Sequence, residues 1–283
     1  MNRRWTEEEK TLLADTYEEN TSETVAGYLN RTPKAVRNMA SIMGVRALKR
    51  SHSFPREARE YFPSSDLAYL IGAIMGDGYV HTYVQKKPRV HVHRYIKLRV
   101  KDFEFAHRAK EAFSKVRGRT SKIYTVYNHH TTISAGTKMF IVQVEDKDLY
   151  NLLNQPLKEL KPYIEAYPRE FLRGFFDAEG SAWIIDRKNK RKRVIHNGRE
   201  HFVNRRSVEP VVSFGNTDKG LLEYVRELLT RLGIFPAPKL GKSKGNFGKN
   251  PKICYNLHIY RKASVERFMR LVGSSIPRKN LVV

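Results

Sequence analysis

Hydrophobic and polar positions follow the same order twice between residue 67 and residue 283. Each copy predicts an apolar helix, a strand pair, an amphipathic helix, a second strand pair and a final helix. In the first copy the strand pairs are expected at 79–100 and 122–145, and the later helices at 103–117 and 146–155. In the second copy the strand pairs are expected at 181–216 and 237–261, and the later helices at 218–232 and 262–272. This duplication predicts an α+β protein with two pseudo-symmetric αββαββα halves, 67–160 and 161–283.

The apolar helix that opens each copy ends in an acidic residue. "LAYLIGAIMGDGYV" (67–80) and "REFLRGFFDAEGSAW" (169–183) align at a constant offset of 102 residues, which places Asp77 on Glu179. A carboxylate at the negative C-terminal end of a helix costs about 0.3–1 kcal/mol. Each acid precedes a glycine, Gly78 or Gly180, which suits the left-handed position that ends many helices. Two matched acids in an unfavourable place indicate a shared role.

Small residues recur four positions apart on one face of each of these helices. They are Gly72 with Gly76 in the first copy and Gly174 with Ala178 in the second. Small side chains let two helix backbones approach closely, so the two copies are expected to pack through these faces. Their C-terminal ends then bring two carboxylates together beside exposed carbonyl groups. A hard divalent cation such as Mg²⁺ resolves this repulsion, because it prefers oxygen ligands and also activates water and phosphate.

Alternation along the predicted strands separates an apolar face from a basic and aromatic face. A solvated antiparallel sheet also alternates, but residues 81–99 contain no acid, which favours a face that binds DNA. The residues expected on this face are His81, Tyr83, Gln85, Arg89, His91, His93, Tyr95, Lys97, Arg99, Asn256 and His258.

The N-terminal residues 1–50 predict a separate three-helix unit, joined by a linker at 51–66. "WTEEE" forms a capping box at the start of the first helix, and Thr32-Pro33 begins the third. With "LNRTPKAVRNMASIMGV", this unit resembles helix-turn-helix modules of the SANT/Myb-like kind. Such a module would place Lys34, Arg37 and Asn38 at a DNA groove. The alternative is a trihelical module that binds protein.

Composition and charge agree with a nucleic-acid partner. The net charge is +24 and the pI is about 10.1, whereas residues 1–66 hold 11 Lys/Arg against 10 Asp/Glu. The surplus therefore lies in the larger part of the chain, and it implies a polyanion. Residues 186–207 alone contain nine Lys/Arg, and phosphate contacts are expected from Arg187, Lys188, Arg191 and Arg193. A single cysteine, no membrane-spanning apolar run and no secretory signal favour an intracellular protein.

The two motifs resemble those of the monomeric LAGLIDADG homing endonucleases, over residues 67 to the C-terminus. The resemblance implies saddle-shaped antiparallel sheets that straddle DNA, and metal-binding acids at Asp77 and Glu179, with the carbonyls of Gly76 and Ala178 as extra ligands. It also implies a basic residue near each centre, Lys279 in "IPRKN" and Lys161 in "KELKPYIEAY". Asp102 and Asn216 match positions that hold solvent near the phosphates. Asp177 matches no metal position and is expected to pack or to form hydrogen bonds.

The function implied by this resemblance is site-specific, double-strand DNA cleavage with Mg²⁺ or another divalent cation such as Mn²⁺. The expected enzyme is a monomer with internal two-fold pseudo-symmetry and a long, partly asymmetric target. The alternative is a non-cleaving binder on the same scaffold, either an intron-RNA maturase or a transcriptional regulator. Both motif acids are present, which counts against a regulator.

Overall fold

The chain divides into two compact units, Met1–Ala58 and Arg59–Val283. The computed structural model describes residues 4–17, 20, 22–45, 59–85, 91–127, 136–244 and 252–282, apart from the side chains of 187–192 and 204–205. No helix within these ranges is both long enough and apolar enough to cross a membrane.

The N-terminal unit contains three short helices around a small apolar core. They are α1 (Glu7–Tyr17), α2 (Ser22–Leu29) and α3 (Pro33–Ile42). The capping box is present, because the Thr6 amide donates to Glu9 and the Glu9 amide donates to the Thr6 hydroxyl. The core of this unit contains Leu13, Tyr17, Val25, Ala26, Leu29, Val36 and Ala40. On α3, the side chains of Lys34, Arg37 and Asn38 are exposed, as the pattern predicts. The helix-turn-helix assignment stays a prediction.

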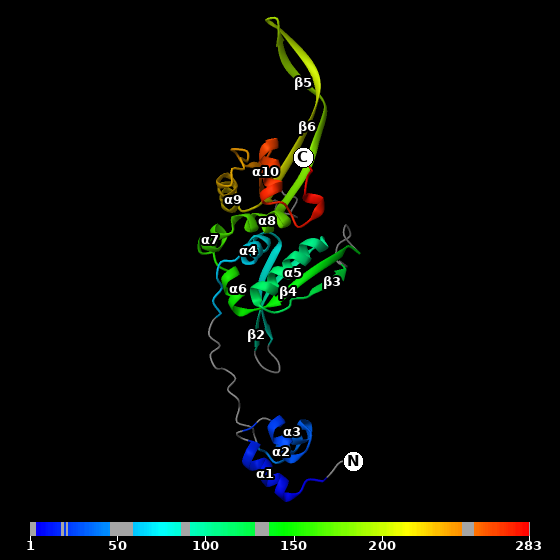
Figure 1. Cartoon of the computed structure of the whole chain (residues 1–283), viewed down its shortest axis with the longest axis vertical. Coiled ribbons are helices and arrows are strands. Elements are labelled where there is room, and N and C mark those ends of the chain that lie inside the picture. Colours follow the sequence, from blue (N-terminus) through cyan, green and yellow to red (C-terminus); the bar gives the residue numbers. More distant parts are fainter. Residues whose placement is uncertain are drawn as a thin grey trace. The chain divides into compact units, whose positions relative to one another are not determined.

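Two central helices join the halves of the larger unit. They are α4 (Ser65–Asp77) and α8 (Pro168–Glu179), which pack on each other at the middle of the unit in Figure 1. A Cβ atom added at Gly72 would lie 2.2 Å from the Phe171 carbonyl oxygen, and one added at Gly174 would lie 2.1 Å from that of Tyr69. The two backbones therefore approach through these glycines, as the spacing of small residues predicts.

The first half places one four-stranded antiparallel sheet beside α4. Its strands are β1 (Gly78–Gln85), β2 (His91–Val100), β3 (Ile123–Tyr127) and β4 (Lys138–Glu145), in the order β1-β2-β4-β3. The helices of this half are α5 (Phe103–Arg117), α6 (Lys147–Leu153) and α7 (Leu157–Ala166). Helix α5 is followed by Gly118, whose φ of 62° is a left-handed conformation that glycine adopts without strain.

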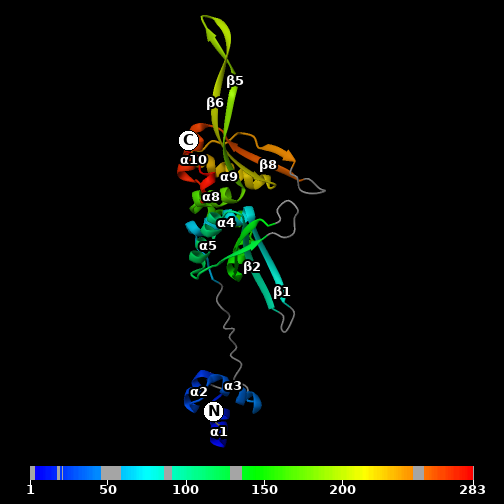
Figure 2. The ribbon, with the colours of Figure 1, turned by 90° about the vertical axis from the view of Figure 1, so that its right-hand side faces the viewer.

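The second half repeats this arrangement with a much longer hairpin. Its strands are β5 (Gly180–His196), β6 (Arg199–Asn216), β7 (Gly241–Lys244) and β8 (Ile253–Ile259), in the order β5-β6-β8-β7. The helices that follow are α9 (Lys219–Arg231), α10 (Lys262–Leu271) and the short 3₁₀ helix η1 (Pro277–Lys279). Within β6, only residues 212–216 pair with β8, so the rest of β5 and β6 forms a two-stranded ribbon (Figure 2).

One face of each sheet packs on helices, which is what the alternation along the strands predicts. Ile96 and Leu98 of β2 are fully buried, and so are Leu257 and Ile259 of β8. These side chains join one continuous core with α4, α5, α8, α9 and α10. The opposite faces of the two sheets remain open.

Candidate metal centre and nucleic-acid face

Asp77 and Glu179 end α4 and α8 at the point where each helix passes into the first strand of its half. The following glycines, Gly78 and Gly180, have φ values of −81° and −89°, so the prediction of a left-handed cap is wrong. Glycine is required there for space. A Cβ atom at Gly78 would lie 2.3 Å from the Ile74 Cα atom, and one at Gly180 would lie 2.5 Å from the Phe176 carbonyl oxygen. The chain thus leaves each helix directly into a strand.

The two acids lie in partly buried surroundings, and the charge of Asp77 acts on Glu179 across the helix interface. Burial raises the pKa of Glu179 to about 7, with a further increase from the negative charge of Asp77. Burial also raises the pKa of Asp77, and the negative charge of Asp102 adds to this increase. A hydrogen bond of 2.9 Å from the Asn216 amide and the positive charge of Lys279 oppose the increase at Glu179. The pair is therefore a partly desolvated acidic site, which favours the binding of a cation.

Lys279 is the cation that the fold places near both acids. Its side chain is buried, and its ammonium group donates to the carbonyl oxygens of Phe176 at 3.0 Å and Asp177 at 2.7 Å. Burial lowers the pKa of Lys279. The lysine thus neutralises the negative end of α8, and the two carbonyls it contacts are not those of Gly76 and Ala178, the predicted metal ligands.

Asp177 anchors the C-terminal segment that carries Lys279. Its carboxylate is 2% exposed and accepts hydrogen bonds from the Tyr69 hydroxyl at 2.7 Å and from Ser274 and Ser275. This agrees with the expected hydrogen-bonding role. Because Ser274 and Ser275 lie close before η1, these bonds hold η1 against the end of α8.

Arg278 links the same segment to the first half of the protein. Its guanidinium makes two bonds to the Asp102 carboxylate, at 3.0 and 2.8 Å. The sequence pattern does not predict roles for Arg278, Tyr69, Ser274 or Ser275. The only signal for Ser274, Ser275 and Arg278 was the cluster "SSIPRKN" just after the last helix, and Tyr69 lies within the first motif helix.

Lys161 lies elsewhere, on α7, with its ammonium group 4.9 Å from the centre of the Tyr224 ring. Among the contacts of the described residues, none joins Lys161 to Asp77 or Glu179. The prediction that it serves the first active centre is therefore not supported by its position.

A cavity of about 360 Å³ lies beside Glu179. Its lining residues are Glu179, Gly215, Asn216, Thr217, Lys252 and Cys254. It leaves space next to one of the two acids on the open side of the second sheet.

The open face of the first sheet carries the predicted aromatic and histidine side chains. The register pairs His81 with Tyr95, Tyr83 with His93, and Gln85 with His91. Rings stack along this face: the centroids of His93 and Tyr95 are 5.6 Å apart and their planes differ by 5°. Lys97 and Arg99 continue the same parity along β2. Arg89 lies outside the described residues.

The open face of the first sheet also contains an acid from outside residues 81–99, the stretch that has none. Glu145, at the end of β4, lies opposite Tyr95 in the register and bonds to His93. The face is therefore less uniformly basic than the sequence of β1 and β2 indicates.

The open face of the second sheet includes Asn256 and His258 of β8, next to Ser213 of β6. Asn256 donates to the Ser243 hydroxyl at 3.1 Å. On the ribbon, the Arg193 guanidinium pairs with Glu200, and Arg206 binds Asp186 through two bonds. The side chains of Arg187, Lys188 and Arg191 lie outside the described residues, so their predicted phosphate contacts stay predictions.

Comparison with known proteins gave similarities of three kinds. Residues 166–273 match the family model of the LAGLIDADG-like domain. An uncharacterized protein of Methanocaldococcus jannaschii is 30% identical over 224 residues, which are 77% of this chain and 69% of that protein. Mesophilic variants of the homing endonuclease I-DmoI share 20% identity over 74% of this chain and 95% of theirs, with a TM-score of 0.48. The LAGLIDADG meganuclease I-AabMI bound to uncleaved DNA shares 14%, over 72% and 82%, with a TM-score of 0.42.

Proposed function

This chain belongs to the LAGLIDADG-like family, and from that premise we propose that it is a metal-dependent endonuclease that cuts both strands of a specific DNA site. The observation that carries the proposal is the meeting of Asp77 and Glu179 at the ends of two packed helices. Burial raises the pKa of both carboxyl groups, and the negative charge of Asp77 raises the pKa of Glu179 further. Such a pair stores unfavourable electrostatic energy that a divalent cation relieves.

The donor set fits Mg²⁺ or Mn²⁺, because these ions take carboxylate and carbonyl oxygens as ligands. Asp77 and Glu179 would hold the cation, with the Gly76 and Ala178 carbonyls as additional donors. A cation at this position would stabilise charge on the phosphate oxygens and lower the pKa of an attacking water.

The surrounding side chains have separate roles in this proposal. Asn216 orients the Glu179 carboxylate through its hydrogen bond. Lys279 supplies a buried positive charge near both acids, where charge accumulates on the phosphate during cleavage. Asp177 and Arg278 position Lys279: Asp177 accepts a hydrogen bond from Ser275, before Lys279 in the same segment, and the neighbouring Arg278 binds Asp102 of the first half.

Double-stranded DNA is the substrate that the remaining surface favours. A net charge of +24 favours a polyanionic partner, and the two open sheet faces carry side chains that can contact base edges. We assign DNA contacts to the face from His81 to Arg99, to Asn256 and His258, and to the basic ribbon. The exposed Lys34, Arg37 and Asn38 of α3 would add contacts from a helix-turn-helix unit.

Cleavage of a randomised DNA target library in Mg²⁺ tests the proposal and identifies the target. Asp77→Asn and Glu179→Gln are expected to reduce double-strand cleavage by about 10²–10³-fold or more, because each removes a carboxylate that would hold the cation. Both variants are expected to keep the DNA affinity of the wild type, measured at the same ionic strength.

Glu159→Gln is the matched control, because Glu159 is an exposed acid on α7, outside the acid pair. It is expected to cut as the wild type does. If both motif variants still cut normally, the assignment of the two acids is wrong. A wild-type protein that binds DNA or intron RNA and cuts no library member supports the alternative, a non-cleaving binder.

A further inference from the structure

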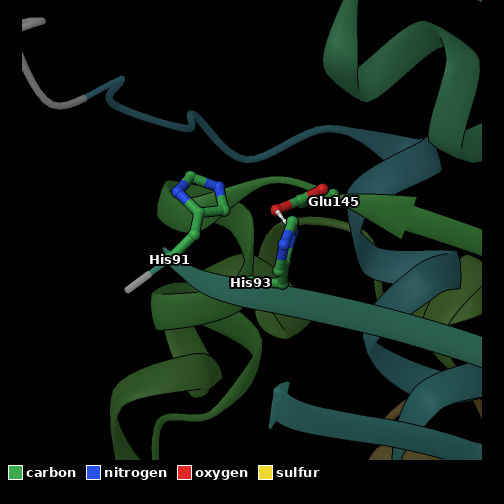
Figure 3. A group of neighbouring side chains, drawn as sticks. All are labelled: His91, His93 and Glu145. Atoms are coloured by element: carbon green, nitrogen blue, oxygen red, sulfur yellow. Dashed lines mark hydrogen bonds and ion pairs between the residues drawn. The ribbon is translucent and has the colours of Figure 1, made fainter. Parts of the chain in front are cut away.

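A second group of metal-ligating side chains lies on the open face of the first sheet. His91 and His93 of β2 and Glu145 of β4 each offer one ligand atom, and these atoms all lie within 4.8 Å of one another. Figure 3 shows the two imidazole rings and the carboxylate on the same side of the sheet. The alternation along the strands predicts DNA contacts for the two histidines and gives no role to Glu145.

The backbone produces this cluster for a simple reason. His91 and His93 are two residues apart on one strand, so both side chains stand on the same face. Strand β4 ends at Glu145, opposite Tyr95, so the Glu145 side chain reaches diagonally toward His93. The His93 Nδ1 atom lies 2.7 Å from the Glu145 carboxylate, and its Nε2 atom lies 3.4 Å from the Gln85 side-chain oxygen.

We infer that His91, His93 and Glu145 form a binding site for a transition-metal ion of the Zn²⁺ class, separate from the acid pair Asp77 and Glu179. Two imidazoles and one carboxylate suit Zn²⁺, Co²⁺ or Ni²⁺ rather than Mg²⁺, which prefers oxygen ligands. Three protein ligands leave a fourth position open toward solvent.

The ligand atoms are close enough that side-chain rotation can bring them to the spacing of a bound ion. Zn²⁺ binds nitrogen and oxygen at roughly 2.0–2.2 Å, so a tetrahedral site holds its ligand atoms about 3.4 Å apart. The ligand atoms now lie within 4.8 Å of one another. Rotation of the His91 and Glu145 side chains would bring them closer, since His91 is exposed and the side chain of Glu145 is 45% exposed. Gln85 lies next to His93 and would orient its ring.

The ion would link the end of strand β2 to strand β4 of the same sheet. Residues 91–94 of β2 pair with β1 only, because β4 ends at Glu145. A metal that joins His91 and His93 to Glu145 ties this projecting part to β4. The expected consequence is a more rigid presentation of Tyr83 and Gln85, which lie opposite His93 and His91 in the register.

Zn²⁺ titration against a chromophoric chelator tests the site in the full chain without DNA. In buffer with excess Mg²⁺, which competes for the acid pair, one tightly bound Zn²⁺ ion per chain is expected, and His91→Ala, His93→Ala and Glu145→Gln are each expected to lower its affinity at least tenfold. The variant Asp77→Asn/Glu179→Gln is expected to retain the wild-type Zn²⁺ affinity. His201→Ala, which changes an exposed histidine outside the cluster, serves as the matched control.

Amide hydrogen exchange supplies a second measurement. Zn²⁺ is expected to slow exchange in residues 82–85 and 91–94 of the wild type, and to leave the same residues of His93→Ala unchanged. The inference is overturned if the wild type binds no Zn²⁺, or if the three cluster variants bind it as His201→Ala does. Loss of binding only in the Asp77→Asn/Glu179→Gln variant would also overturn it. None of these outcomes depends on DNA cleavage, so they are distinct from a failure of the proposed function.

Discussion

The two halves of the larger unit share a backbone plan but differ in the polar groups that support their acids. Glu179 accepts a hydrogen bond from Asn216, which belongs to its own half. Asp77 lies near Asp102, whose charge raises the pKa of Asp77 and whose carboxylate is held by Arg278 from the second half. Lys279 acts on both acids.

The difference follows from the order of the chain. The segment from Ser274 to Asn280 follows α10, the last α-helix of the second half, and it contacts both the end of α8 and Asp102 of the first half. Within the described residues, the first copy has no segment that makes the equivalent contacts. A duplicated backbone therefore yields a symmetric helix interface and an asymmetric set of charges around it.

The helix interface is the symmetric feature of the two halves. Its disruption should give the largest loss of stability. Gly72→Ala and Gly174→Ala each place a methyl group about 2 Å from a backbone carbonyl oxygen of the opposite helix. Each is expected to lower the free energy of unfolding by about 3 kcal/mol, measured by chemical denaturation. The two losses should be similar, because the two glycines occupy matched positions.

Gly27→Ala is the control for a glycine-to-alanine change within a helix. An added Cβ atom at Gly27 meets nothing within 4 Å, so its substitution should not destabilise the protein. Unfolding free energies of Gly72→Ala and Gly174→Ala that equal the wild-type value would contradict the close approach of α4 and α8.

The polar surroundings of the two acids are asymmetric, and one pair of aligned residues tests this asymmetry. Asp177 in the second copy matches Met75 in the first. Asp177→Ala is expected to lower the free energy of unfolding by about 2 kcal/mol, because buried hydroxyl and amide donors of Tyr69 and Ser275 lose their acceptor. Met75→Leu is expected to cost less, since it conserves volume and removes no hydrogen bond.

Asp177→Ala should also slow DNA cleavage, because it loosens the segment that places Lys279 near the acids. Denaturation and cleavage assays on the same two variants check both statements. Equal effects from Asp177→Ala and Met75→Leu would show that the hydrogen bonds of Asp177 contribute nothing.

The smallest expected effect is in the pH dependence of metal binding. Glu179 must lose its proton to bind a cation, and its pKa in the metal-free protein is about 7. The Mn²⁺ affinity, measured by calorimetry, is therefore expected to be full above pH 7. Below pH 7 it is expected to fall about tenfold per pH unit, which equals about 1.4 kcal/mol.

Two substitutions should move this pH profile in opposite directions. Asn216→Ala removes a hydrogen bond that stabilises the charged carboxylate, so it should raise the pKa of Glu179 and move the fall to higher pH. Asp102→Asn removes a negative charge near Asp77, so it should lower the pKa of that group. Shifts in the same direction would mean that the two acids do not have separate surroundings.

Most of the fold could be predicted because it depends on local periodicity. Both sheets, both central helices and the paired acids occur where the repeated pattern places them, since strand and helix periods are properties of neighbouring residues. The wrong prediction concerned Gly78 and Gly180. A glycine after a helix fits either a left-handed cap or a close approach, and only the packing of Ile74 and Phe176 selects the second.

The two lysines predicted to lie near the acids occupy different positions in the structure. Lys279 contacts the end of α8, but Lys161 lies over Tyr224, although both follow a helix in the sequence. Their different positions depend on how the last segment folds back, and this has no period along the chain. Arg278 and Glu145 were missed for the same reason, because each acts on a residue brought near by tertiary pairing.

The sequence by itself determined the duplicated architecture, the matched acids and the basic, aromatic strand faces, because each is a repeat or an alternation among near neighbours. Only the tertiary structure decided what surrounds those groups. It placed one C-terminal lysine beside both acids, and it set two histidines beside a carboxylate from another strand. The physical reason is that burial, charge interaction and metal coordination depend on distances in space, which sequence spacing does not fix.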